Sequence, residues 1–152
     1  MQSKIAFNEK VSPEEFILLR AAVLFHDFGY IDKYLDNETI GADYAREILP
    51  NYGFNSPQVI KVCELIMATR VPQKPNNHLE RVICDADLDY LGREDFISIS
   101  SNFYKELKEY RMVKNKKEWD QLQIKFLKSH HFFSEYSINN RSSLKKKNLE
   151  FI

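Results

Sequence analysis

Apolar residues recur at helical spacing along most of the chain, and no segment shows the strict alternation of apolar and polar positions that is typical of a strand. Ser12, Pro13 and Glu15 have the order of a capping box with proline in the first turn, so a helix is expected to begin here. This helix is apolar on nearly every side, which predicts a central, buried element that ends near Gly29.

The same periodicity predicts further helices, separated by scarce glycines and prolines, at about residues 37–49, 56–67, 78–91, 94–112 and 116–136. Ser56 and Pro57 repeat the order of a capping residue followed by proline, so Ser56 is the expected cap. Residues 70–77 contain two prolines and are predicted to form a loop. The tail with its three consecutive lysines, 145–147, is expected to fray. The predicted fold class is all-α.

Composition narrows the class of protein. A length of 152 residues suits one domain. Lys and Arg total 22, as do Asp and Glu, and this zero net charge argues against general nucleic-acid binding while allowing a small phosphorylated ligand. Cys63 and Cys84 lie within apolar helical patterns, so buried free thiols and a cytoplasmic location are expected. Neither a signal peptide nor an apolar run long enough to span a membrane is visible.

The dipeptide His26-Asp27 places two polar groups at the end of an apolar helix. Burying them without partners would cost several kcal/mol, on the order of 2–7 per group, and a bound divalent cation would offset that cost. A satisfied core histidine is the competing interpretation.

Asp85, Asp87 and Asp89 alternate with apolar residues in a second segment. On a continuous helix Asp85 and Asp89 would share a face and Asp87 would lie on another, so at most one or two could face the core. Carboxylates this close repel one another unless a cation lies nearby. A solvated acidic face is the competing interpretation.

Together these motifs resemble the HD domain of metal-dependent phosphohydrolases, most of all its small bacterial members. The resemblance covers about Leu18 to Phe96 and is carried by the stretches AVLFHDFGY (22–30), ETIGA (38–42), IMATR (66–70) and CDADLDYLG (84–92). It implies a single domain formed by an HD-domain helical bundle at about residues 12–96, with a helical C-terminal extension at about 97–152.

The resemblance also implies a ligand set. His26 and Asp27 match the family's metal-binding pair and Asp87 its downstream ligand, while Asp85 and Asp89 would support the ligands or lie on a helix face. The family's upstream histidine has no counterpart in residues 1–10. A truncated chain or another group, such as His78, would account for this departure, whereas His130 and His131 are expected to pack or to lie on the surface. Asn37 and Thr69 stand where some relatives carry histidines, so one metal ion is expected rather than two.

The expected cofactor is therefore one divalent ion, Mn, Fe, Co, Ni or Mg. The implied activity is hydrolysis of a nucleotide or related phosphate ester through a metal-activated water, with Asp27 orienting the water or accepting its proton. Arg70 and Lys74 are the candidates for phosphate contact.

Two other functions stay open: a degenerate HD domain that binds metal or nucleotide without turnover, and a helical interaction module. The aromatic C-terminal helices could form a homodimer surface in each case.

Overall fold

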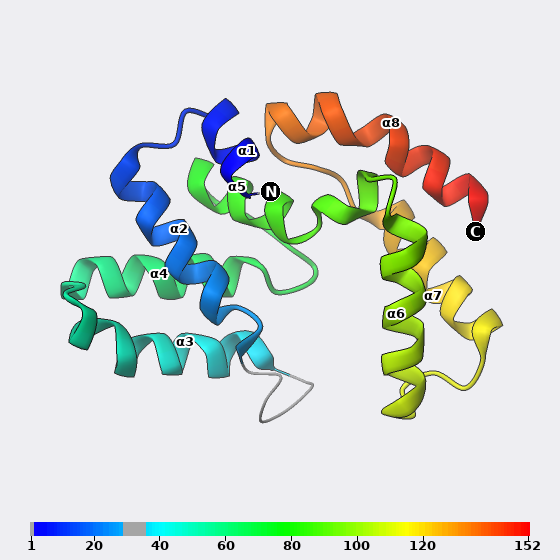
Figure 1. The fold of residues 1–152 in the computed structure, drawn as a ribbon, viewed down its shortest axis with the longest axis horizontal. Coiled ribbons are helices and arrows are strands. Elements are labelled where there is room, and N and C mark those ends of the chain that lie inside the picture. Colours follow the sequence, from blue (N-terminus) through cyan, green and yellow to red (C-terminus); the bar gives the residue numbers. More distant parts are fainter. Residues whose placement is uncertain (1, 29–35) are drawn as a thin grey trace. The chain divides into compact units, whose positions relative to one another are not determined.

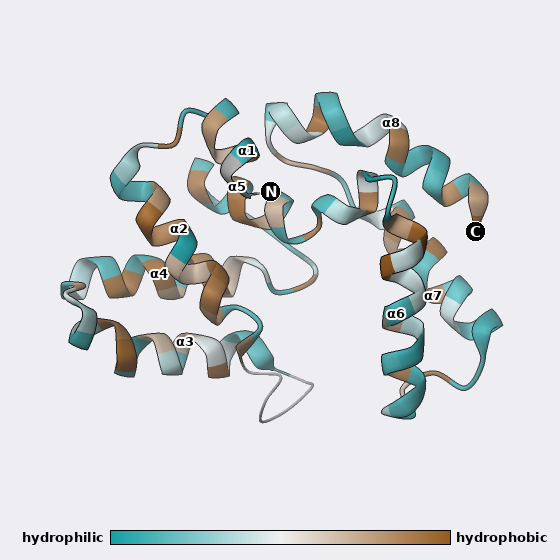
Figure 2. Ribbon diagram, viewed as in Figure 1, coloured by the Kyte–Doolittle hydropathy of each residue, from teal (hydrophilic) through white to brown (hydrophobic). Residues whose placement is uncertain are grey.

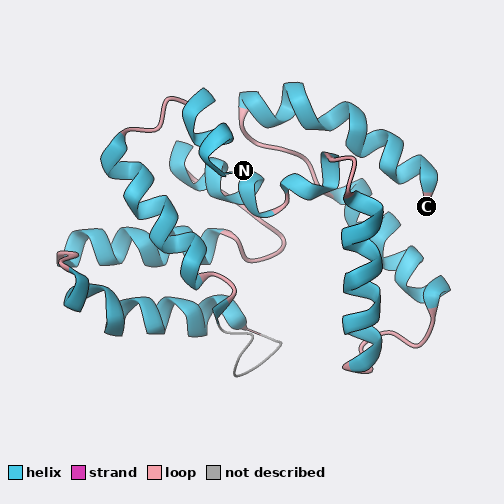
Figure 3. Ribbon diagram, in the orientation of Figure 1, coloured by secondary structure: helices cyan, strands magenta, loops and turns pink. Residues whose placement is uncertain are grey.

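The computed structural model describes residues 2–28 and 36–152, and every regular element within them is a helix (Figure 3). The prediction of an all-α fold is confirmed. Gly29, the expected end of the first long helix, lies outside the described residues. None of the helices described is both long and apolar enough to pass through a membrane.

The chain divides into two compact units, residues 1–87 and 88–152, and this boundary lies inside the expected core of about residues 12–96. The helices of the first unit, shown in Figure 1, are α1 (Gln2–Asn8), α2 (Pro13–Phe25), α3 (Asn37–Ile48), η2 (Leu49–Tyr52), α4 (Ser56–Ala68) and α5 (His78–Asp87). Helix α4 is the centre of this unit, because α2, α3 and α5 all pack against it. Helix α1, which the hydrophobic pattern does not predict, packs against α5, and its residues Ile5 and Ala6 are buried.

The start of α2 has the predicted capping box. The backbone N–H of Ser12 donates to Glu15 Oε2 at 3.0 Å, and the N–H of Glu15 donates to Ser12 Oγ at 3.3 Å. The expectation of a central, buried helix is wrong for α2, because α4 is the centre of the unit and one face of α2 is open, with Ile17 and Leu24 55% and 74% exposed. The neighbours of α2 cover only part of its circumference.

Glycine lets α3 approach the end of α2 closely. A Cβ atom on Gly41 would overlap the backbone carbonyl oxygen of Phe25, the last residue of α2. This approach places the beginning of α3 beside the residue that follows Phe25, His26.

Two predicted helix ends in the first unit are wrong. Helix α4 is capped by Asn55 rather than Ser56, because Asn55 accepts from the N–H of Gln58 and Gln58 returns a bond to the N–H of Asn55. The helix expected to run to residue 91 ends at Asp87, and the chain tightens into a short 3-10 helix, η3 (Asp89–Gly92), in the second unit.

The second unit contains η3, α6 (Phe96–Glu109), α7 (Lys116–Ser129) and α8 (Glu135–Phe151). Its buried apolar cluster consists of Leu88, Leu91, Phe96, Leu127 and Phe132. The hydropathy colouring of Figure 2 shows brown residues at the beginning of α6, where Phe96 enters this cluster.

Helix α8 corrects the prediction for the end of the chain. The helix expected to reach residue 136 ends at Ser129, because His130 is extended, and Ser134 then caps a new helix. The expectation that lysines 145–147 fray is wrong. They lie in α8, which packs against η3. Asp89 accepts from Arg141 Nε at 2.7 Å, and Asn148 donates to the carbonyl of Leu91 at 2.9 Å.

Candidate metal centre

His26 is oriented by the helix that it ends. Its backbone N–H donates to the carbonyl of Ala22, and its ring Nδ1 lies 2.8 Å from the carbonyl oxygen of Val23. A carbonyl oxygen can only accept, so Nδ1 carries the hydrogen of this bond. The other ring nitrogen, Nε2, is thereby aimed away from α2. The side chain is only 15% exposed, so the ring is held within the first unit.

Two carboxylates face this nitrogen. His26 Nε2 lies 3.2 Å from Asp27 Oδ2 and 3.3 Å from Asp87 Oδ1. Asp27 follows His26 in the chain, whereas Asp87 is the last residue of α5. The Asp27 side chain is 62% exposed and that of Asp87 is 23% exposed, so solvent reaches the group mainly from the side of Asp27. The structure therefore brings together the three residues predicted as ligands.

Gln73 holds Asp87 from the proline-containing loop. Its Nε2 donates to Asp87 Oδ2 at 3.0 Å and lies 3.4 Å from the carbonyl oxygen of Thr69, while its Oε1 is buried without a hydrogen-bond partner within the described residues. The sequence did not single out Gln73, because a polar residue between two prolines is an ordinary loop residue. Asn37, buried at the start of α3, donates to the carbonyl of His26 at 3.1 Å.

The charges of this group shift two pKa values. Burial acts to lower the pKa of His26, but the hydrogen bond and charge of Asp87, with the charge of Asp27, outweigh burial and raise that pKa to about 9. Burial and the nearby Asp87 raise the pKa of Asp27, partly offset by His26. This raised pKa favours the protonated imidazole at neutral pH, which places a positive charge between the two carboxylates.

The two separations at His26 Nε2 can be compared with those between neighbouring ligands of a metal ion. As they stand, no group of three or more His, Cys, Asp or Glu side chains in residues 2–28 and 36–152 is arranged to hold a metal. Ligand atoms about 2.1 Å from an octahedral ion nevertheless lie about 3 Å apart when adjacent, close to the 3.2 and 3.3 Å separations at Nε2. A nitrogen with two carboxylates suits a divalent ion that takes the position of the Nε2 proton.

The other acids of the motif do not share the predicted helix face. Asp85 is fully buried in α5, whereas Asp89 belongs to η3 in the second unit and binds Arg141. The expectation that Asp85 and Asp89 lie on one face is wrong because α5 ends at Asp87, between them.

His78 does not join the group. It begins α5, so it lies at the opposite end of this helix from Asp87, and its Nε2 is 2.9 Å from the carbonyl oxygen of Glu9. His130 and His131 belong to the second unit.

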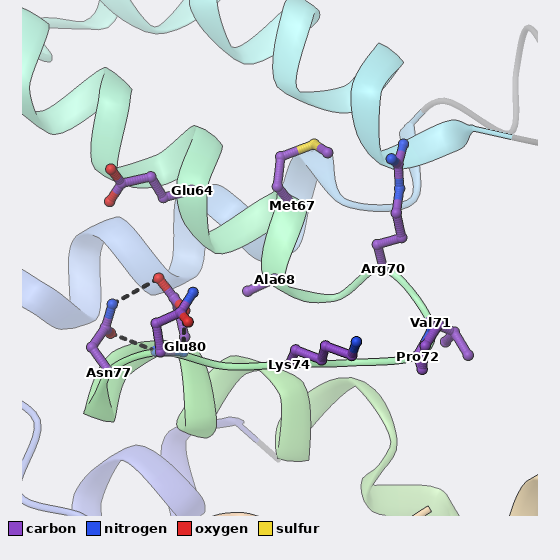
Figure 4. A pocket seen from close by; sticks show the side chains of 10 residues that line it. Glu64, Met67, Ala68, Arg70, Val71, Pro72, Lys74, Asn77 and Glu80 are labelled. Atoms are coloured by element: carbon purple, nitrogen blue, oxygen red, sulfur yellow. Dashed lines mark hydrogen bonds between the residues drawn. The ribbon is translucent and has the colours of Figure 1, made fainter.

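Arg70 and Lys74 line a cavity of about 630 Å³ in the first unit (Figure 4). Its lining comprises Glu64, Met67, Ala68, Arg70, Val71, Pro72, Lys74, Asn76, Asn77 and Glu80, and includes none of the three predicted metal ligands. In Figure 4 the side chain of Arg70 points toward the beginning of α3, where its guanidinium donates to Asp36, the residue before this helix, and, at 2.8 Å, to Thr39 Oγ1. The structure thus does not bring Arg70 and Lys74 into the group around His26.

A scan against protein-family models, a search of curated proteins and a search of solved structures each give no match.

Proposed function

We propose that His26, Asp27 and Asp87 bind one divalent metal ion, and that the first unit is an HD-type phosphohydrolase that acts on a nucleotide or related phosphate ester. The observation that carries this proposal is the direction of the His26 ring. Because Nδ1 donates to Val23, a neutral imidazole presents its lone pair at Nε2 to two carboxylate oxygens, all three of them acceptors. Only a cation at that point, a proton or a metal ion, makes the arrangement favourable.

Metal-binding histidines usually donate their second ring nitrogen to a carbonyl or a carboxylate, and the bond to Val23 has this form. Gln73 supports Asp87 in the same way, since its amide occupies Oδ2 and leaves Oδ1 toward His26. The unpartnered Gln73 Oε1 offers an acceptor for a water molecule at this position.

A bound divalent ion would supply a Lewis acid for the phosphoryl group and lower the pKa of a coordinated water. Asp27 is the group suited to handle that proton, because its carboxylate is the most exposed of the three and its pKa is raised by burial and by Asp87. Asp87 and His26, less exposed, are suited to hold the ion.

Metal content tests the binding step. After incubation with Mn²⁺, Co²⁺, Ni²⁺ or Mg²⁺ and dialysis, elemental analysis should find about one equivalent per chain. His26→Ala should abolish this binding. The control His78→Ala removes an exposed histidine of the same unit that contacts Glu9 and should retain the metal. Equal metal content in wild type and His26→Ala would contradict the proposal that His26 binds the metal.

Hydrolysis of mono- and bis-nitrophenyl phosphate by the metal-loaded protein tests turnover, with Asp87→Ala as the inactive variant. The alternative, a site that binds metal or nucleotide without turnover, is favoured by one observation. Arg70, the expected phosphate contact, is engaged by Asp36 and Thr39. Metal binding that depends on His26, combined with no hydrolysis of either ester or of nucleoside phosphates, would favour this alternative.

A further inference from the structure

Charge is unevenly divided between the two units. Residues 1–87 carry 9 Lys or Arg and 13 Asp or Glu, whereas residues 88–152 carry 13 and 9, so the formal net charges are −4 and +4. The expectation against nucleic-acid binding rests on the zero charge of the whole chain, and this premise does not apply to the second unit, which has a positive net charge.

The excess is concentrated where α6 ends and α7 begins. Residues 105–117, here called the basic turn, contain two acids and six cations, the latter being Lys105, Lys108, Arg111, Lys114, Lys116 and Lys117. All six side chains are exposed, and the end of α6 is coloured as hydrophilic in Figure 2. Lys116 pairs with Asp120, and none of the other five forms an ion pair within the described residues.

An aromatic ring and a thioether are exposed among these cations. Tyr110 is 62% exposed and Met112 is 43% exposed, while Val113, only 3% exposed, anchors the turn in the unit. One turn earlier in α6, Lys108 Nζ lies 5.8 Å from the centre of the Tyr104 ring. The basic turn thus combines exposed cations with an exposed ring on a fixed backbone.

We propose that the basic turn binds single-stranded nucleic acid. Cations that follow a phosphate backbone and aromatic rings on which bases stack are the two features of such surfaces. An anionic membrane would need a broader apolar face beside the cations. An acidic protein segment would use the cations but would gain little from a ring at their centre.

The backbone at Arg111 gives the proposal a sharp test. Arg111 follows the end of α6 in the left-handed conformation, with φ of 57°, at a place where helices commonly have glycine. Arg111→Gly relieves this conformation and removes one cation of the basic turn. We expect it to raise the melting temperature and to weaken nucleic-acid binding, two effects that a merely structural role would not combine.

Binding is measured by fluorescence anisotropy with a labelled oligothymidylate and a labelled oligouridylate, from low salt to about 200 mM salt. Arg111→Glu/Lys114→Glu should weaken binding about tenfold or more at low salt. The control Lys146→Glu/Lys147→Glu makes the same change of charge at two exposed residues of α8 and should leave affinity within about twofold. Tyr110→Ala should also weaken binding, while Tyr110→Phe retains it. Circular dichroism verifies that each variant is folded.

An equal loss in the α8 control would overturn the proposal, because binding would then follow net charge rather than this turn. It is also overturned if neither oligonucleotide binds at low salt. Binding to vesicles of anionic lipid without binding to either oligonucleotide would assign the turn to a membrane surface instead. A change in oligomeric mass in Arg111→Glu/Lys114→Glu, without bound oligonucleotide in wild type, would assign it to a second copy of the chain.

Discussion

Gln73 is not a proposed ligand, but its side chain donates to Asp87 in the proposed metal centre. Its amide fixes one oxygen of Asp87 and lies close to the carbonyl of Thr69, so loop and ligand are held together. We expect Gln73→Ala to weaken metal affinity by about 10-fold or more, the usual effect of losing a group that orients a ligand. Titration calorimetry with Mn²⁺ measures it. Unchanged affinity would show that Asp87 is positioned without Gln73.

His130 contrasts with His26, because its surroundings disfavour the protonated, charged form of the ring. Its ring packs edge-on against Phe132 with centroids 4.8 Å apart, and neither ring nitrogen has a hydrogen-bond partner within the described residues. Burial, followed by the nearby charges of Lys145 and His131, lowers its pKa from 6.5 to about 3.

This lowered pKa predicts acid sensitivity. The unfolded chain takes up a proton at His130 near pH 6.5, whereas the folded protein does so only near pH 3, so the stabilisation is complete above 6.5 and is lost progressively between these values as pH falls. Guanidinium unfolding of wild type at about pH 7.5 and about pH 5 should show a larger loss of stability than the same measurement on His130→Phe. Equal losses in the two proteins would contradict the assignment.

At the level of elements, the start of α4 allows the contributions of two adjacent residues, Asn55 and Ser56, to helix stability to be compared. Asn55 accepts from the N–H of Gln58 at 3.0 Å, while Ser56 is already inside the helix. Asn55→Ala should lower the free energy of unfolding by about 1 kcal/mol, and Ser56→Ala should change it little. Thermal or chemical denaturation of both variants measures this. The reverse order would restore Ser56 as the cap.

Hydrophobic periodicity predicts where most helices lie but not where several of them end. Helix α5 is followed by η3, and the backbone of η3 accepts a hydrogen bond from Asn148 of α8, far away in the sequence. The end of α7 before His130 likewise has no proline or glycine nearby, so the local sequence does not predict it. Such ends are determined by contacts between distant segments, and periodicity carries no information about them.

The proposed metal centre likewise has a part that the sequence predicts and a part that it does not. His26 and Asp27 stand out in the sequence because they are polar groups at the end of an apolar helix. Asp87 is selected among three neighbouring acids only by the resemblance to the HD domain. The structure brings the three within hydrogen-bonding reach. The anchor of the His26 ring is the backbone of Val23, which has no signature in the amino-acid sequence. The engagement of Arg70 by Asp36 joins two loops that no pattern pairs.

For the whole molecule, balanced charge has a direct physical consequence. The chain has zero formal net charge and an isoelectric point of about 6.9, while its units carry opposite charges. Molecules with no net charge repel one another least, and unlike regions attract. Solubility should therefore be lowest near pH 7 and rise with added salt of about 0.15 M, which screens that attraction. Light scattering against pH and salt measures this, and a minimum far from neutrality would contradict it.

The close approach of α3 to α2 at Gly41 also limits which amino acids the fold tolerates at its glycine positions. Gly41 and Gly92 are required for space, because an added Cβ would meet the backbone of Phe25 in the first case and, at 2.5 Å, the carbonyl oxygen of Arg141 in the second. Gly53 is required for conformation alone, with φ of 84° and open space around it. In a library that varies each position, folded survivors should accept asparagine at 53 but no replacement at 41 or 92.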